Sequence, residues 1–152
     1  MLAERPTYMV HALAAARAAA AQGEVPVGTV VIEAATGRIL ATAGNRTVAA
    51  SDPTAHAEML AIRAACAAMG APRLTGCDLY VTLEPCAMCA AAISFARIRR
   101  LYFGAYDPKG GGVEHGAQFY RRDTCHHRPE VFGGIDEAAA GQLLKDFFAS
   151  RR

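Results

Sequence analysis

The chain has 152 residues, of which 53% are hydrophobic and 20% are charged. This length and composition fit one globular domain with a core of useful size, residues 1–152, and exclude a largely disordered chain. The formal net charge of +2 and a pI near 8.3 permit a nucleic-acid partner without requiring one.

The alanine-rich N-terminal segment lacks the features of a secretory signal, because Glu4 and Arg5 cancel at its head and Arg17 interrupts its apolar run. No other stretch approaches the length of a membrane span. The cysteine count of five is odd, and a metal site described below uses two. The other three are expected to be free thiols, typical of a reducing cytoplasm: Cys66, Cys77 and Cys125. Because no stretch is long enough to span a bilayer, no membrane partner is expected.

The first half of the chain predicts a helix, a hairpin and a second helix. Alanine and aliphatic residues favour helix over residues 7–22, and Gly23 ends it. The β-branched run 25–32 and the run 38–43 flank a threonine-glycine turn, which predicts an antiparallel hairpin. Apolar positions at helical spacing then predict a helix over residues 56–69.

The second half alternates strands and helices. Residues 78–83 are nearly all apolar and predict a central strand, and Pro85 begins another helix. Such alternation implies a largely parallel sheet after the opening hairpin. The remaining predictions are a strand over residues 98–103, a long glycine-rich loop over 107–127, a short strand over 128–132 and an amphipathic helix over 136–152.

Two segments carry metal-site chemistry: His56-Ala57-Glu58, and Pro85-Cys86-Ala87-Met88-Cys89. One imidazole and two thiolates supply three zinc ligands and leave the fourth position for water, the arrangement of a catalytic zinc. Each half alone has an ordinary alternative: a capped helix start for His56, and a structural zinc knuckle or redox pair for the cysteines. Together, in this order, they match the pattern of zinc-dependent nucleobase deaminases.

The residue types also predict a mechanism. Zn²⁺ held by His56, Cys86 and Cys89 activates a water that attacks the carbon bearing an exocyclic amine. Glu58 is not a ligand and is the expected proton shuttle from water to the ring nitrogen and the departing ammonia. The alternative from another class is a non-catalytic, zinc-stabilised binding module, in which Glu58 would be dispensable.

Further motifs extend over essentially the whole chain: Glu24-Val25-Pro26-Val27-Gly28, Gly44-Asn45-Arg46, Thr82-Leu83-Glu84-Pro85-Cys86 and Phe103-Gly104-Ala105-x-Asp107. With these motifs the chain resembles the bacterial tRNA adenosine deaminases of the TadA type, in the cytidine deaminase-like superfamily. The resemblance implies a three-layer α/β/α sandwich with a five-stranded mixed sheet, and a homodimer. It also implies conversion of adenosine to inosine at the wobble position of a tRNA anticodon stem-loop.

The resemblance further implies which residues contact the substrate. A carboxamide can both donate to and accept from a base edge; the alternative for Asn45 is a turn residue after a strand. Asp107 is followed by proline, which alone indicates a turn just as well. The residues expected at the substrate are Asn45, Ala57, Leu83, Glu84 and Asp107.

Several alternatives stay open. A deaminase of free nucleobases such as guanine or cytosine, or of free nucleosides, would share the zinc site, although the motifs around Val25 and Leu83 favour the tRNA branch. Arg97, Arg99 and Arg100 are either a phosphate-binding patch or the solvated flanks of a strand. The terminal pair Arg151-Arg152 has the same alternatives, and Cys125-His126-His127 lacks an evident fourth ligand for a second metal.

Overall fold

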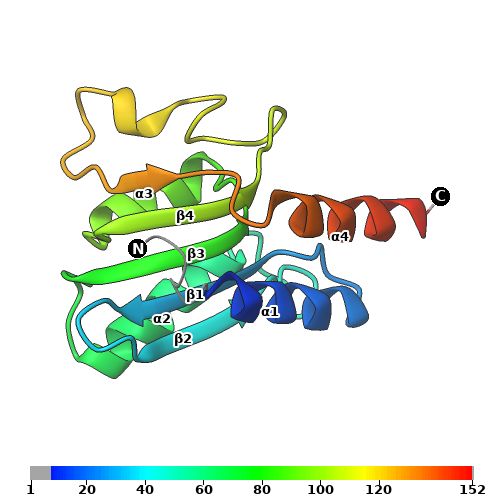
Figure 1. Ribbon diagram of the computed structural model, residues 1–152, viewed down its shortest axis with the longest axis horizontal. Helices are drawn as coiled ribbons and strands as arrows, with labels where there is room; N and C mark the ends of the chain where they lie inside the picture. Colours follow the sequence, from blue (N-terminus) through cyan, green and yellow to red (C-terminus); the bar gives the residue numbers. More distant parts are fainter. Residues whose placement is uncertain (1–7, 152) are drawn as a thin grey trace, which may run out of the picture.

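The computed structural model describes residues 8–151, and its centre is one five-stranded sheet (Figure 1). The order across the sheet is β2-β1-β3-β4-β5. β1 is antiparallel to both neighbours, whereas β3, β4 and β5 are parallel. The expected mixed, five-stranded sheet is therefore confirmed. The strands are β1 Gly28–Glu33, β2 Ile39–Gly44, β3 Cys77–Leu83, β4 Arg100–Ala105 and β5 Glu130–Phe132.

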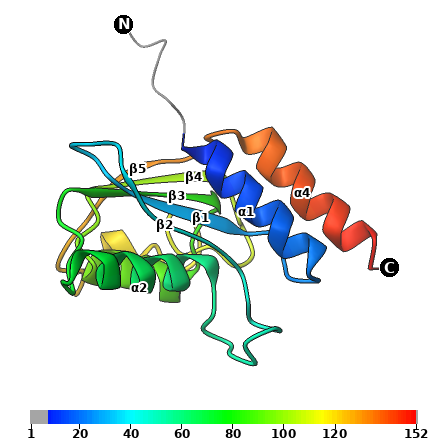
Figure 2. The same cartoon turned by 90° about the horizontal axis from the view of Figure 1, so that it is seen from below.

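Helices cover both faces of this sheet. Figure 2 shows α1 (Met9–Ala21) and α4 (Glu137–Ala149) side by side on one face, with α2 (Ala57–Met69) on the opposite face. α3 (Ala87–Phe95) contacts α2 and shares its core. The three-layer α/β/α sandwich is confirmed.

Alternating side chains on the strands separate the two cores. Val30 and Tyr80 pack with α1 and α4, whereas their neighbours Val31 and Leu79 pack with α2 and α3. This alternation follows from the two-residue period of a strand. Both central strands are therefore buried on both faces, as the apolar run 78–83 predicts.

Every predicted element is present, with shifted ends. β1 begins at Gly28 rather than at residue 25, because Pro26 has no N–H to donate to a ladder. β4 begins at Arg100 rather than at 98, because the Ile98 N–H donates to Ile93 O in the turn that closes α3. The loop over 107–127 contains one short 3₁₀ turn, Phe119–Arg121. The predicted helix ends at Thr7 and Arg152 lie outside the described residues.

Candidate active site

The starts of two helices meet beside the C-terminal end of the central strand β3. His56 is the residue that precedes α2, and Cys86 is the residue that precedes α3. Each helix turns its positive end toward this place, which favours thiolates and other anions there. Cys89 follows Cys86 by about one turn, so both sulfurs point to one side of α3.

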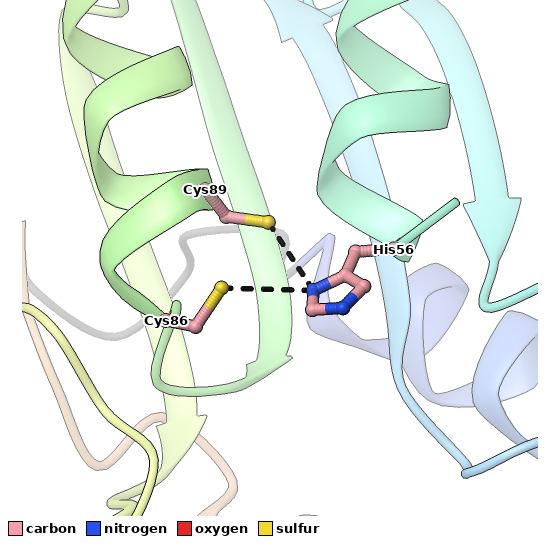
Figure 3. Close-up of side chains that lie close together, drawn as sticks. All are labelled: His56, Cys86 and Cys89. Atoms are coloured by element: carbon pink, nitrogen blue, oxygen red, sulfur yellow. Dashed lines mark hydrogen bonds between the residues drawn. The ribbon is translucent and has the colours of Figure 1, made fainter. Parts of the chain in front are cut away.

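The three expected metal ligands converge, as Figure 3 shows. His56 Nδ1 lies 3.6 Å from Cys86 Sγ and 3.5 Å from Cys89 Sγ. A tetrahedral zinc with ordinary Zn–N and Zn–S bonds would place a nitrogen and a sulfur ligand about 3.6 Å apart. The donor set and its spacing therefore fit zinc. Among the described residues, these side chains form the only group of three or more metal-type side chains whose ligand atoms all lie within 4.8 Å of one another.

The ligand side chains polarise one another. Hydrogen bonds from the Cys89 thiol and from His56 lower the pKa of the Cys86 thiol to about 4. The pKa of the Cys89 thiol is raised, because that thiol donates to Cys86 and is buried. The hydrogen bond to Cys86 raises the pKa of His56. A divalent cation among these groups favours the thiolate form of both cysteines.

Glu58 lies on the first turn of α2 and only 4% of it is exposed. Burial raises the pKa of its carboxyl group to about 7. A cation held by the neighbouring ligands acts in the opposite direction, since it favours the ionised form. A carboxyl group that can both take and give a proton near neutral pH suits the shuttle predicted from the sequence.

A cavity of about 350 Å³ opens in front of these side chains. This volume is near the lower limit for small-molecule pockets, roughly 300–1,000 Å³. Cys89 lies buried behind it. Seven residues predicted from the sequence line the cavity: Asn45, His56, Glu58, Leu83, Glu84, Cys86 and Asp107.

Asn45 has one end of its carboxamide already engaged. Its Oδ1 accepts a hydrogen bond from the Ala57 N–H at 2.8 Å, which satisfies one of the unpaired amides at the start of α2. The Asn45 NH₂ group is the donor that remains for a ligand. Ala57 itself is fully buried and does not line the cavity; its hydrogen bond orients Asn45, and its expected substrate contact stays a prediction.

Asp107 and Glu84 are both engaged in hydrogen bonds with the loop that follows β4. Asp107 Oδ1 accepts from the N–H groups of Lys109 and Gly110 at 3.2 and 2.9 Å, so the turn suggested by Asp107-Pro108 is present. Glu84 also accepts from backbone groups of this loop. Both residues line the cavity with their carboxylates engaged, and their substrate contacts stay predictions.

Four other residues line the cavity that were not predicted as site residues from the sequence: Val25, Val27, Thr47 and Gly110. The signal for the two valines was present, because they belong to the Glu24-to-Gly28 motif. Thr47 had none beyond its position three residues after the end of β2.

The arginines before β4 lie away from this site. Arg99 forms two hydrogen bonds with the buried Asp78, at 2.9 and 2.7 Å, and Arg100 pairs with Glu130 at 3.1 Å. These pairs sit at the start of β4, and the cavity is at its end, about 17 Å further along a six-residue strand. The structure therefore favours their structural interpretation over a phosphate-binding patch beside the active site.

The other two sequence alternatives also have structural explanations. The main-chain carbonyl of His127 accepts from Ser94 Oγ at 2.7 Å and from Cys125 Sγ at 3.2 Å, and His127 Nε2 bonds Ile98 O at 2.7 Å. These contacts fix the segment 125–127 against the end of α3 and the residues that follow it. The guanidinium of Arg151 lies 4.0 Å from the ring centroid of Phe147.

A three-ligand zinc site at a cavity is typical of catalytic zinc enzymes, and the His56-x-Glu58 and Pro85-Cys86-x-x-Cys89 pattern that builds it here is that of the hydrolytic zinc deaminases. Residues 3–105 match the family model of the cytidine and deoxycytidylate deaminase zinc-binding region. The chain belongs to this family and is a zinc-dependent deaminase.

Known relatives place the chain within the family. It is 55% identical over 151 residues to a tRNA-specific adenosine deaminase of Agrobacterium fabrum, with 99% of this chain and 98% of the relative covered. It is also similar to a structure from a study of A-to-I editing by tRNA:A34 deaminases at the wobble position of transfer RNA. The TM-score is 0.89 at 56% identity, over 92% of this chain and 100% of the other. A guanine deaminase from Nitrosomonas europaea is more distant, with a TM-score of 0.79 at 26% identity over 98% and 87% of the two chains.

Proposed function

We propose that this chain converts adenosine to inosine at the wobble position of a tRNA anticodon. The observation that carries the proposal is the 55% identity with a tRNA-specific adenosine deaminase over 99% of the chain. The active-site geometry supplies the chemistry, because two of the zinc ligands, Glu58 and the Asn45 side chain line one cavity. An unpaired base in an anticodon loop can enter such a cavity without the breaking of a duplex.

The surface beside the cavity suits a substrate in which the base remains attached to a polynucleotide. A neighbouring hollow of about 460 Å³ shares four lining residues with the cavity: Val25, Leu83, Asp107 and Gly110. Tyr106, Phe148 and Lys109 also line this hollow. Aromatic rings stack on bases, and a lysine attracts phosphate. A free base would use none of these groups.

The residues divide the reaction among them. His56, Cys86 and Cys89 would hold the zinc ion, which when bound would lower the pKa of water and supply the nucleophile. Glu58 accepts a proton from that water, delivers it to the ring nitrogen and assists the departure of ammonia. The Asn45 NH₂ group donates to the base, and Leu83 forms an apolar wall. Ala57, Glu84 and Asp107 complete the site, through the hydrogen bonds described above.

A substrate comparison tests this function. We would measure inosine formation in an anticodon stem-loop with adenosine at the wobble position, beside free adenosine, guanine and cytosine, at two salt concentrations. We expect kcat/KM to be highest for the stem-loop and to fall with salt, because phosphate contacts release counterions. Efficient turnover of guanine with an unmodified stem-loop would replace this function with that of a free-base deaminase.

We also propose that the active protein is a homodimer that works in the cytoplasm as one domain. Phe95 on α3 is 72% exposed, which suits a subunit contact better than water. The free thiols support a reducing compartment. None of the helices in residues 8–151 has the length and apolarity needed to cross a bilayer. Sedimentation of the wild type and of Phe95→Glu would show whether the dimer forms and whether this face holds it.

A further inference from the structure

The carboxylate of Glu84 has five hydrogen-bond donors around it. Oε1 accepts from the Asp107 N–H at 3.0 Å and pairs with His115 Nδ1 at 2.8 Å. Oε2 accepts from three successive backbone N–H groups, those of Val113, Glu114 and His115, at 3.2, 2.9 and 3.1 Å. Three such amides in a row form an anion-binding concavity, and here a side chain of the same protein fills it.

This carboxylate has no capacity left for a substrate. An ionised carboxylate offers about four lone-pair sites, and five donors already address it. The side chain is also fully buried. Glu84 therefore forms part of the cavity wall, but its carboxylate is not free to bind a base.

The hydrogen bonds of Glu84 connect two walls of the cavity. Glu84 lies two residues before the metal ligand Cys86, and its backbone N–H donates to Ala105 O at 2.8 Å. The opposite wall is the loop that begins at Asp107 and includes Gly110. The loop is also held through Gly112, whose N–H donates to Pro85 O at 2.8 Å.

The loop passes so close to Glu84 that only glycine fits. A Cβ atom on Gly111 would lie 2.4 Å from Glu84 Oε2 and 2.5 Å from Asp107 O. Both distances are far below van der Waals contact, so any side chain there would push the loop away from the carboxylate. The glycine at position 111 is thus explained by the approach of the loop backbone to one buried anion.

We infer that Glu84 is a positioning residue: its carboxylate holds residues 107–115 against the segment that carries Cys86, and so fixes the cavity wall that contains Asp107 and Gly110. It acts on the substrate through this loop. His115 strengthens the attachment by adding a side-chain donor to its backbone donor.

The test uses Glu84→Gln in the full-length zinc protein. Glutamine keeps the size of the side chain but loses the charge and turns an NH₂ group toward N–H donors. We expect backbone amide exchange at Val113, Glu114 and His115 to accelerate about tenfold or more. KM for the stem-loop should rise about 10- to 100-fold with a smaller change in kcat. Zinc content should remain at the wild-type level, since no ligand is changed.

Two further variants make the result specific. Gly111→Ala leaves the carboxylate intact but displaces the loop from it, so it should reproduce both the faster exchange and the higher KM. If Glu84→Gln fails to fold, Gly111→Ala alone tests the inference. Glu130→Gln is the matched control: this carboxylate also pairs with a cation, Arg100, but its side chain is 63% exposed and lies at the far end of β4. It should change neither measurement.

Three outcomes would overturn the inference. Loss of zinc in Glu84→Gln would mean that Glu84 acts through Cys86. A raised KM with unchanged amide exchange would mean that Glu84 contacts the substrate directly. Wild-type exchange and KM in Gly111→Ala would mean that the loop does not depend on this contact. The KM measurement rests on the proposed function, but the exchange is measured without substrate, so failure of the wild type to modify the stem-loop would be seen separately.

Discussion

Asn45 has two roles that substitution can separate. Its Oδ1 accepts from the Ala57 N–H at 2.8 Å, and the side chain lines the cavity with its NH₂ group as the donor that remains. Asn45→Ala removes both groups. Asn45→Asp keeps an acceptor for Ala57 and removes only the donor, so the pair distinguishes support of α2 from recognition of the base.

The structure sets the size of each effect. Ala57 is fully buried, so Asn45→Ala leaves its N–H without a protein acceptor. An unpaired buried N–H costs about 1–3 kcal/mol, and each kcal/mol lowers Tm by about 2–4 °C in a chain of this size. Asn45→Asp should match or exceed the wild-type Tm, because a negative charge at a helix N-terminus stabilises by about 0.3–1 kcal/mol.

Activity should follow a different pattern. Both variants lack the donor to the base and should lose about 10²-fold in kcat/KM for the stem-loop. We would measure Tm by calorimetry and inosine formation under single-turnover conditions. If Asn45→Asp were destabilised as much as Asn45→Ala, the capping argument would be wrong. If it kept near wild-type kcat/KM, Asn45 would not be a donor to the base.

Three further predictions concern the metal and the buried carboxylates. Cys86→Ser should lose most of its zinc by atomic absorption, because three protein ligands leave no redundancy; full occupancy would contradict the ligand assignment. Glu58→Gln should keep zinc and fold but lose about 10²- to 10⁴-fold in turnover, and near-normal turnover would require another proton shuttle. Hydrogen bonds from the backbone N–H groups of Ala49 and Val48 lower the pKa of Glu24 below 4.5. Its stabilising effect is therefore present above about pH 4.5 and lost as pH falls through the lower, folded-state pKa. Glu24→Gln should flatten the acid limb of urea stability curves, and an unchanged limb would rule out this contribution.

The metal ligands could be predicted from sequence because local geometry determines most of their arrangement. Cys86 and Cys89 are one turn apart at the start of a helix, and their spacing alone aligns the sulfurs. His56 lies at the start of the helix after β2. The two helix starts meet because β2 and β3 run in the same direction, with the reversed β1 between them. A strand-helix-strand connection produces that direction, as the alternating pattern indicates.

The partners of the buried side chains could not be predicted in the same way. Glu84 binds residues 23 to 31 positions further along the chain, in a loop with no periodic pattern. Those pairings depend on how an irregular loop returns to the end of β3, which no local preference specifies. For Asp107 the sequence left a substrate contact and a turn equally open; the structure shows the turn, and the substrate contact stays a prediction. The arginines at the start of β4 were ambiguous for the same reason: Arg99 pairs with Asp78 and Arg100 pairs with Glu130 on the edge strand, and both partners are distant in sequence.

The two carboxyl groups at this site, those of Glu58 and Glu84, show that burial alone does not determine the pKa of a carboxyl group. Glu58 and Glu84 are exposed by only 4% and 2%, and both line the cavity. Burial raises the pKa of Glu58 to about 7. Burial would raise the pKa of Glu84 as well, but the hydrogen bonds from Asp107, His115 and Glu114 outweigh it and lower that pKa. A carboxylate surrounded by donors stays an anion and holds a loop, whereas one with few donors can exchange its proton. The same residue type therefore supplies the proton shuttle in one wall of the cavity and the fixed support of the other.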